Sequence, residues 1–292
     1  MVRDYKRRLI QLASALLYNA NLKGFANGAI YQGESKGLCV PGLNCYSCPG
    51  AVASCPLGSL QNALSSISYR WPMYILGALL LFGLLLGRIV CGFLCPFGLI
   101  QELIYKIPTP KIRKNRTTRI LSRIKYVILA IFVVYLPLFF GIRSGYPLPA
   151  FCKYICPAGT LEGGIPLVAS DASLQALTGT LFSWKVCLML LCLISMVFLY
   201  RSFCRFLCPL GAIYSLFAKL SILGITVDNA KCTHCGRCVE FCKMDVKIPG
   251  DGECIQCGEC RKTCHTDAII WKSNGILPAH AACKKHSNPK KS

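Results

Sequence analysis

Hydrophobic and charged positions occur in long blocks along this chain. Three uncharged apolar runs, 72–87, 126–142 and 186–200, each end at an arginine. They are slightly shorter than the roughly 20 residues that cross a bilayer, but flanking Trp and Tyr residues can extend them as interfacial anchors. A weaker apolar stretch lies near the N-terminus. We therefore predict four membrane spans, at about 8–26, 70–90, 122–142 and 182–202.

The basic residues between these runs predict the orientation of the chain. Eight Lys and Arg residues lie between 106 and 125, and four more lie within the first eight residues. Lys and Arg accumulate in cytoplasmic loops, so both segments should face the cytoplasm, with two spans between them. We expect a multi-pass protein of the cell (cytoplasmic) membrane, with loops 27–70 and 144–183 outside and the C-terminal part on the cytoplasmic side.

The two halves of the apolar region repeat each other. Arg88, Cys91 and Cys95-Pro recur 113 residues later as Arg201, Cys204 and Cys208-Pro. The outer segments are also similar, because Cys55-Pro-Leu-Gly resembles Cys156-Pro-Ala-Gly. Such internal similarity indicates that two structural units pack against each other, here about a pseudo-twofold axis.

The C-terminal cysteines have the spacing of a two-cluster ferredoxin. The motif C-x2-C-x2-C-x3-C occurs twice, and its fourth cysteine ligates the other cluster. We assign one [4Fe–4S] cluster to Cys232, Cys235, Cys238 and Cys264, and the second to Cys254, Cys257, Cys260 and Cys242. Zinc is the alternative, but two such triple-spaced runs are unusual for zinc sites. Gly236 and Gly258 should allow the backbone to approach the clusters.

The cysteines nearer the spans are candidates for one or two further iron–sulfur clusters. The repeat axis brings together the inner pairs Cys91, Cys95, Cys204 and Cys208, with structural thiols as the alternative. On the outer side, the same symmetry pairs Cys48 and Cys55 with Cys152 and Cys156. Alternatively, the first loop's own cysteines, Cys39, Cys45, Cys48 and Cys55, could hold a cluster, or the outer cysteines could form disulfides. We expect Cys187 and Cys192 to be core residues.

Composition limits the remaining possibilities. Charged residues make up only 15% of the chain, and the net charge is +21. The cations flank the apolar runs, so we do not expect nucleic-acid binding. No histidine lies in the predicted spans, and no C-x-x-C-H motif occurs, so we expect no haem. The predicted fold is mainly α: a four-helix transmembrane bundle (1–228) built from a two-span repeat, a small α+β two-cluster ferredoxin-like domain (229–275) and a basic tail (276–292).

With these motifs in view, the chain resembles the NapH/NosR family of polyferredoxin-type membrane proteins. The resemblance rests on the two inner Cys-x3-Cys-Pro motifs and the eight C-terminal cysteines, and it covers nearly the whole chain. It implies the membrane component of a quinol dehydrogenase, an electron-transfer part of an oxidoreductase. The outer cysteines are a departure from the family pattern and suggest an additional electron carrier on that side.

The leading hypothesis is therefore an electron relay that connects a quinone pool or a cytoplasmic donor to an acidic redox partner, with transfer across the bilayer as one route. Gln61, Gln101 and Glu102 are weak candidates for a quinone site. The alternative function is a reductase or assembly factor that maintains a metal or thiol centre of another enzyme, with the outer cysteines as its working dithiol. A redox sensor is a third class, but the sequence offers no output module.

Overall fold

The computed structural model describes residues 2–66, 72–112 and 114–272, and most of this chain is helical. A buried core runs through the whole molecule and includes cysteines from both halves of the repeat. The first half contains α1 (Val2–Tyr18), α2 (Lys23–Asn27), α3 (Pro56–Ser65), α4 (Met73–Leu85) and α5 (Pro96–Ile104), with a 3-10 turn at Glu34–Gly37 and a π-helical turn at Val90–Leu94.

The second half begins with a continuous helix from Arg116 to Ser144. It comprises α6 (Arg116–Leu121), α7 (Ile124–Ile128), the π-helical stretch Leu129–Tyr135 and α8 (Leu136–Ser144). Pro137 near the start of α8 cannot donate a backbone hydrogen bond. The π-helical stretch changes the pattern of backbone hydrogen bonds just before this proline. There follow α9 (Ala150–Tyr154), a π-helical turn (Gly159–Gly164), α10 (Ile165–Ser170), α11 (Ala172–Ala176), α12 (Thr180–Phe198), α13 (Ser202–Phe206) and α14 (Pro209–Phe217).

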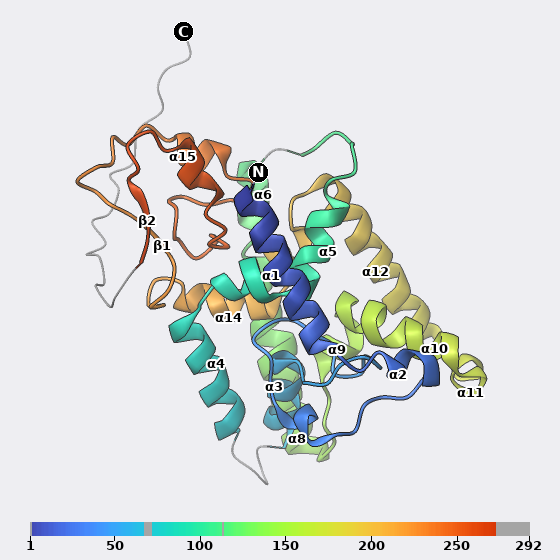
Figure 1. Cartoon of the computed structure of the whole chain (residues 1–292). Coiled ribbons are helices and arrows are strands. Elements are labelled where there is room, and N and C mark those ends of the chain that lie inside the picture. The colour runs from blue at the N-terminus through green and yellow to red at the C-terminus, as the bar shows by residue number, and fades with distance from the viewer. Residues whose placement is uncertain (1, 67–71, 113, 273–292) are drawn as a thin grey trace.

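The C-terminal module is small and has little regular structure. It contains β1 (Ile225–Val227), α15 (Arg237–Phe241), a 3-10 helix (Glu259–Thr263) and β2 (Ile269–Trp271). The two strands are antiparallel, with Thr226 opposite Ile270. β1, which pairs with β2, lies just before the expected boundary at 229, and that boundary stays a prediction. Figure 1 shows α15 and both strands at the end of the molecule where α1 begins, with α8 toward the opposite end.

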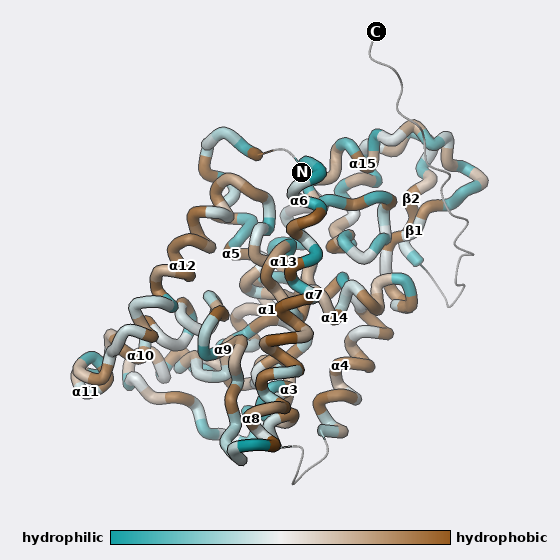
Figure 2. The backbone as a smooth tube through the Cα atoms, turned by 180° about the vertical axis from the view of Figure 1, so that it is seen from behind, coloured by the Kyte–Doolittle hydropathy of each residue, from teal (hydrophilic) through white to brown (hydrophobic). Residues whose placement is uncertain are grey.

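Two helices in the described part of the chain are long and apolar enough to cross a membrane: Arg116–Ser144 and Thr180–Phe198. They match the expected spans 122–142 and 182–202. The hydrophobic side chains of α12 include several that are about half exposed, such as Leu191 and Ile194. Figure 2 shows this hydrophobic character along α12 and α4. These outward faces are apolar, as a lipid-facing surface requires.

The first two expected spans differ from the helices observed. The helix in 70–90 is α4, whose 13 residues extend about 20 Å, less than the roughly 30 Å hydrocarbon core. Residues 70 and 71 lie outside the described residues. The helix near 8–26 is α1, which begins and ends earlier and buries Arg7 and Gln11 rather than an apolar face. The four-span bundle therefore stays a prediction. The basic tail, 276–292, also lies outside the described residues.

Candidate iron–sulfur sites

Each of the four Cys-Pro-x-Gly motifs begins a helical turn. Cys55, Cys95 and Cys208 are the N-cap residues of α3, α5 and α14, and Pro157 follows Cys156 in the same way. Proline is favoured at the first helical position, because its missing N–H would have no partner there. In every motif the sulfur lies where the backbone N–H of the glycine three residues later can donate to it. The helix N-terminus thus stabilises a thiolate at each motif.

The inner site consists of Cys91, Cys95, Cys204 and Cys208. All four are buried, and they come from the turns that follow α4 and α12. Burial raises the pKa of Cys208, and the nearby thiols of Cys204, Cys91 and Cys95 raise it further. The structure therefore brings together the four cysteines that the repeat pairs. Bound iron would replace the thiol protons and so offset the mutual repulsion of the four neighbouring thiolates.

Two fully buried arginines flank the inner site, at equivalent positions of the repeat. Arg201 Nη2 lies 2.6 Å from Glu102 Oε1, and Arg7 forms two 2.8 Å hydrogen bonds to the same carboxylate. Burial acts to raise the pKa of Glu102, but the charge of Arg201 and the bonds from Arg7 outweigh it and hold the pKa at about 2. Glu102 is therefore ionised between two cations.

The second arginine takes part in a similar group of charges. Glu253 of the C-terminal module lies 2.7 Å from Lys125 Nζ and 3.4 Å from Arg88 Nη2. Each carboxylate thus has two cationic partners. Arg7 also lies 3.4 Å from Glu259 Oε1, so a surplus positive charge remains only in the group around Glu253. Buried charges are costly unless compensated. A cluster bound by four thiolates carries net negative charge, so the residues present fit such a group.

The N-terminal helix α1 also faces the inner site. Arg7 Nη1 donates to the carbonyl of Gly92, next to Cys91, and Tyr18 at the other end of the helix lies near Cys95. Gln11 lies on the same helix face between them and has no exposed surface. Neither polar atom of its side chain has a hydrogen-bond partner among the described residues. A buried, unpaired amide in this place fits a site that is completed by a bound group.

The outer site consists of Cys45, Cys55, Cys152 and Cys156. These four cysteines line one cavity of about 330 Å³. Burial raises the pKa of Cys152 to about 12, and the thiols of Cys55 and Cys45 contribute in the same direction. A Cβ atom on Gly159 would lie 3.8 Å from the sulfurs of both Cys45 and Cys156. The glycine therefore leaves space beside two sulfurs.

The outer site differs from the symmetry pairing, which placed Cys48 where the structure places Cys45. The second half supplies Cys152 four residues before Cys156, but the equivalent residue before Cys55 is Ala51. The fourth thiol must therefore come from a more distant residue. This residue is Cys45, whose backbone N–H donates to Glu162 Oε2 at 2.8 Å. Cys48 instead lies near Lys36, and Cys39 Sγ lies 3.4 Å from Ser59 Oγ. All of these outer cysteines are free thiols in the structure.

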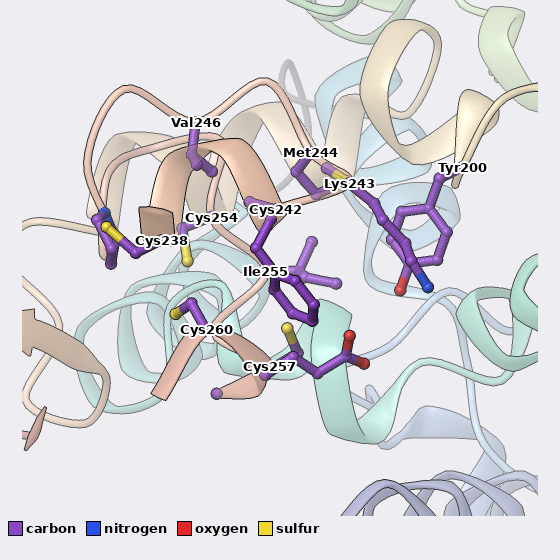
Figure 3. Close-up of a pocket in the computed structure, with 14 residues that line it drawn as sticks. Tyr200, Cys238, Cys242, Lys243, Met244, Val246, Cys254, Ile255, Cys257 and Cys260 are labelled. Atoms are coloured by element: carbon purple, nitrogen blue, oxygen red, sulfur yellow. The ribbon is translucent and has the colours of Figure 1, made fainter. Parts of the chain in front are cut away.

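The C-terminal module contains two further cysteine groups. Cys242, Cys254, Cys257 and Cys260 line a pocket of about 30 Å³ (Figure 3). Cys232 and Cys235 lie near Cys238, and Cys238 and Cys264 pack against the cluster of Ile225, Cys260 and Ile269. Cys238 also lines the pocket with Cys242, Cys254, Cys257 and Cys260, so the crossed assignment made from the spacing stays a prediction.

The two ferredoxin loops follow the same backbone path. Gly236 and Gly258 have φ of 74° and 77°, and His234 and Gln256 have φ of 55° and 58°. This left-handed conformation is unfavourable for most residues with a Cβ atom, which explains glycine at the first pair of positions. In the part of the chain that the structure describes, no three His, Cys, Asp or Glu residues are arranged to hold a single metal ion.

The second ferredoxin loop packs directly on the inner site. A Cβ atom on Gly92 would lie 2.3 Å from the carbonyl oxygen of Ile255, so the two backbones touch. Arg88 Nε donates to the carbonyl of Gly252 at 2.8 Å. Arg205 pairs with Asp245 where both are buried. The module is thus held on the rest of the chain through the loop that carries Cys254 and Cys257.

We expect Gly92→Ala to displace this loop. The added methyl group would overlap the Ile255 carbonyl, so the loop must shift away from Cys91. Hydrogen exchange at 253–257 should become faster by about tenfold, which corresponds to roughly 1.4 kcal/mol of lost protection. Gly77→Ala is the matched control, since a Cβ atom on Gly77 in α4 meets nothing within 4 Å. Unchanged exchange at 253–257 in Gly92→Ala would contradict the close contact.

Two cysteines of α12 lie outside all four groups. Cys192 is buried in the core as expected, near Cys204 but outside the inner group of four. Cys187 is exposed, so the expectation that it is a core residue was wrong. Sequence reasoning identified Arg88 and Arg201 as matching positions of the repeat, but as residues that flank the spans. Their full burial was missed, because it depends on Glu102 and Glu253, which lie far from them in sequence.

Comparisons with known proteins agree with this geometry. A 4Fe-4S binding domain family matches residues 69–115, 126–165 and 180–224, and a second 4Fe-4S binding domain family matches 225–247. An uncharacterized protein of Methanocaldococcus jannaschii is 30% identical over 165 residues, which cover 56% of this chain and 62% of that protein. No solved structure matches the chain.

Two relatives have printed names that describe them further. The methylamine utilization ferredoxin-type protein MauN of Paracoccus denitrificans is 26% identical over 63% of this chain and 58% of its own length. The regulatory protein NosR of Pseudomonas aeruginosa is 27% identical over 65% of this chain and 26% of its own length. The chain thus spans less than two thirds of the length of these relatives. By its repeated 4Fe-4S binding domains and these relatives, the chain is similar to the NapH/NosR-like polyferredoxin-type proteins, and its named relatives are iron–sulfur electron transport proteins.

Proposed function

We propose that this chain is a membrane-embedded electron relay with four [4Fe–4S] clusters in series. Electrons pass between the two ferredoxin clusters, then to the inner site (Cys91, Cys95, Cys204, Cys208) and the outer site (Cys45, Cys55, Cys152, Cys156). The observation that carries the proposal is that one continuous core contains Cys254 of the module together with buried cysteines of both the inner and the outer site. Short steps between neighbouring sites are what electron transfer requires.

The membrane location of the relay is part of the proposal. Two apolar helices and the exposed apolar side chains of α4 and α12 support it. With the orientation expected from the basic residues, the ferredoxin module faces the cytoplasm and the outer site faces the opposite side. The relay would then connect a cytoplasmic donor or a quinone pool to a redox partner across the bilayer.

The exposed end of the relay favours an acidic partner protein. Three acidic residues of the module, Asp245, Glu253 and Glu259, face the rest of the chain and pair there with arginine or lysine. The loop around the exposed Cys235 carries Lys231 and Arg237, both exposed. The segment that carries the first cluster thus exposes two cations, Lys231 and Arg237, and one carboxylate, Glu240. Complementary charge accelerates encounter with an acidic partner.

Iron and acid-labile sulfide, measured anaerobically on detergent-purified protein, test the relay directly. We expect about sixteen irons per chain, four for each [4Fe–4S] cluster, with EPR signals from more than the two ferredoxin clusters. About eight irons would limit the clusters to the module and refute the relay through the membrane. Zinc in place of iron would refute electron transfer altogether.

A reductase or assembly factor is the second candidate. It is favoured by Cys39 and Cys48, which lie beside the outer site but outside its group of four. Eight irons together with rapid alkylation of Cys45 and Cys55 would indicate a working thiol site rather than a bound cluster. Protection of these thiols from alkylation in the iron-loaded protein would instead favour the relay.

A further inference from the structure

A large polar side chain recurs six residues after the cysteine of each Cys-Pro-x-Gly motif. The residues are Gln61, Gln101, Glu162 and Tyr214, which follow Cys55, Cys95, Cys156 and Cys208. Gln61, Gln101 and Tyr214 have no exposed surface. A polar group at such a position is costly unless it is paired, so its repeated presence requires an explanation.

The two glutamines reach across the repeat to cysteines of the other half. Gln101 Nε2 donates to Cys204 Sγ at 2.9 Å, and Gln61 Nε2 donates to Cys152 Sγ at 3.2 Å. Gln101 therefore serves the inner site and Gln61 the outer site. Each bond goes to the first cysteine of a Cys-x3-Cys-Pro motif, contributed by the opposite half.

Backbone groups fix which end of each amide faces the sulfur. Gln61 Oε1 accepts from the N–H of Phe151 at 2.9 Å, and Gln101 Oε1 accepts from the N–H of Cys204 at 3.4 Å. If either amide were flipped, its NH₂ group would face another donor. The backbone contacts therefore direct the NH₂ group to the sulfur, although amide orientation is otherwise ambiguous.

The second-half residues at the same position make different bonds. Glu162 accepts from the backbone N–H of Cys45, and Tyr214 donates to the carbonyl of Pro41 at 2.7 Å. Both contacts join a residue of the second half to the loop of the first half. The two halves therefore contact each other through this position in both directions. Each site thus receives one side-chain N–H bond to sulfur from a glutamine.

We propose that Gln101 and Gln61 are positioning residues that set the reduction potentials of the inner and outer clusters, by donating one N–H to a thiolate ligand in each. The inference rests on the proposed function, since it requires clusters at both sites. Reduction adds one electron to a cluster, and no proton is transferred. The added negative charge strengthens the hydrogen bond to the thiolate, so the bond favours the reduced state and raises the potential.

Gln101→Met and Gln61→Met test the proposal by redox titration followed by EPR. Methionine has similar length and no N–H donor. We expect the reduced-to-oxidised ratio of the affected cluster, at a fixed potential, to fall about tenfold, which is about 59 mV for a one-electron couple. Gln101→Met should shift only the inner cluster, and Gln61→Met only the outer one. Gln175→Met, on the exposed α11, is the control.

A second measurement, on the unmutated chain, tests the proposal even if a variant loses its cluster. With ¹⁵N-glutamine side-chain labelling, pulsed EPR should detect a hyperfine coupling to each reduced membrane cluster. Absence of that coupling overturns the proposal even where a variant loses iron. Full iron content without a potential shift, or an equal shift at both sites, also overturns it. About eight irons in the unmutated chain would refute the relay itself, and this inference would fall with it.

Discussion

Cys208→Ala is expected to remove one cluster and to interrupt electron transfer through the chain. The cysteine is buried at the N-terminus of α14, its sulfur accepts from the N–H of Gly211 at 3.3 Å, and three other inner cysteines surround it. Alanine leaves three thiolates for a cluster that requires four. We expect about four fewer irons per chain, with the ferredoxin signals retained.

The larger effect of this substitution is on the rate of transfer. The inner site lies between the ferredoxin loop and the outer site, so its loss replaces two short steps by one long step. Reduction of the outer cluster by a donor at the module should slow by orders of magnitude in stopped-flow measurements. Cys192→Ala is the control, because this cysteine is buried in the same core but lies outside all four groups. Equal rates in Cys208→Ala and the unmutated chain would contradict the series arrangement.

The sequence predicted the inner site because both halves of the repeat carry the same residues there. Cys91 and Cys95 have counterparts at Cys204 and Cys208, so the pseudo-twofold axis alone pairs them. The outer site follows the repeat only in part. Ala51 stands where a fourth cysteine would complete the symmetry, and the choice between Cys45 and Cys48 depends on how the loop folds back to Glu162.

Charge was harder to interpret than cysteine spacing. An arginine at the end of an apolar run is typical of a membrane boundary, and sequence reasoning assigned Arg88 and Arg201 to that role. Their burial depends on carboxylates from other parts of the chain, and Glu253 belongs to a different module. A contact between elements so far apart cannot be deduced from local patterns. The signal that was present is the exact repetition of both arginines three residues before a cysteine.

Helix boundaries also depended on tertiary contacts. Hydropathy placed the first span over 8–26, but α1 ends at Tyr18, where the side chain of Asn19 bonds back to Ala15 and across to Asn44. The buried face of α1 carries Arg7 and Gln11, whose burial near the inner site no apolar pattern could indicate. The long apolar helices, in contrast, were predicted well, because their composition alone determines them.

The buried carboxylate of Glu102 is expected to be essential for stability. In Glu102→Gln, the guanidinium groups of Arg7 and Arg201 would lose their shared anion while both remain buried. Removing one partner of a buried ion pair costs about 3–5 kcal/mol. The pKa of Glu102 is lowered from its ordinary value of 4.5 to about 2, so its contribution is present above about pH 5 and is lost as the pH falls toward 2. The full effect should therefore be measurable at pH 7.

Thermal unfolding in detergent compares this variant with Glu34→Gln, whose side chain is exposed and should have little effect. The double variant Arg7→Gln/Glu102→Gln separates charge balance from packing. If Glu102 acts by neutralising the buried guanidinium groups of Arg7 and Arg201, removal of one of these cations should recover part of the lost stability, so the two substitutions will be less destabilising together than their sum. Additive losses would show that packing around Glu102, rather than its charge, stabilises this region beside the inner site.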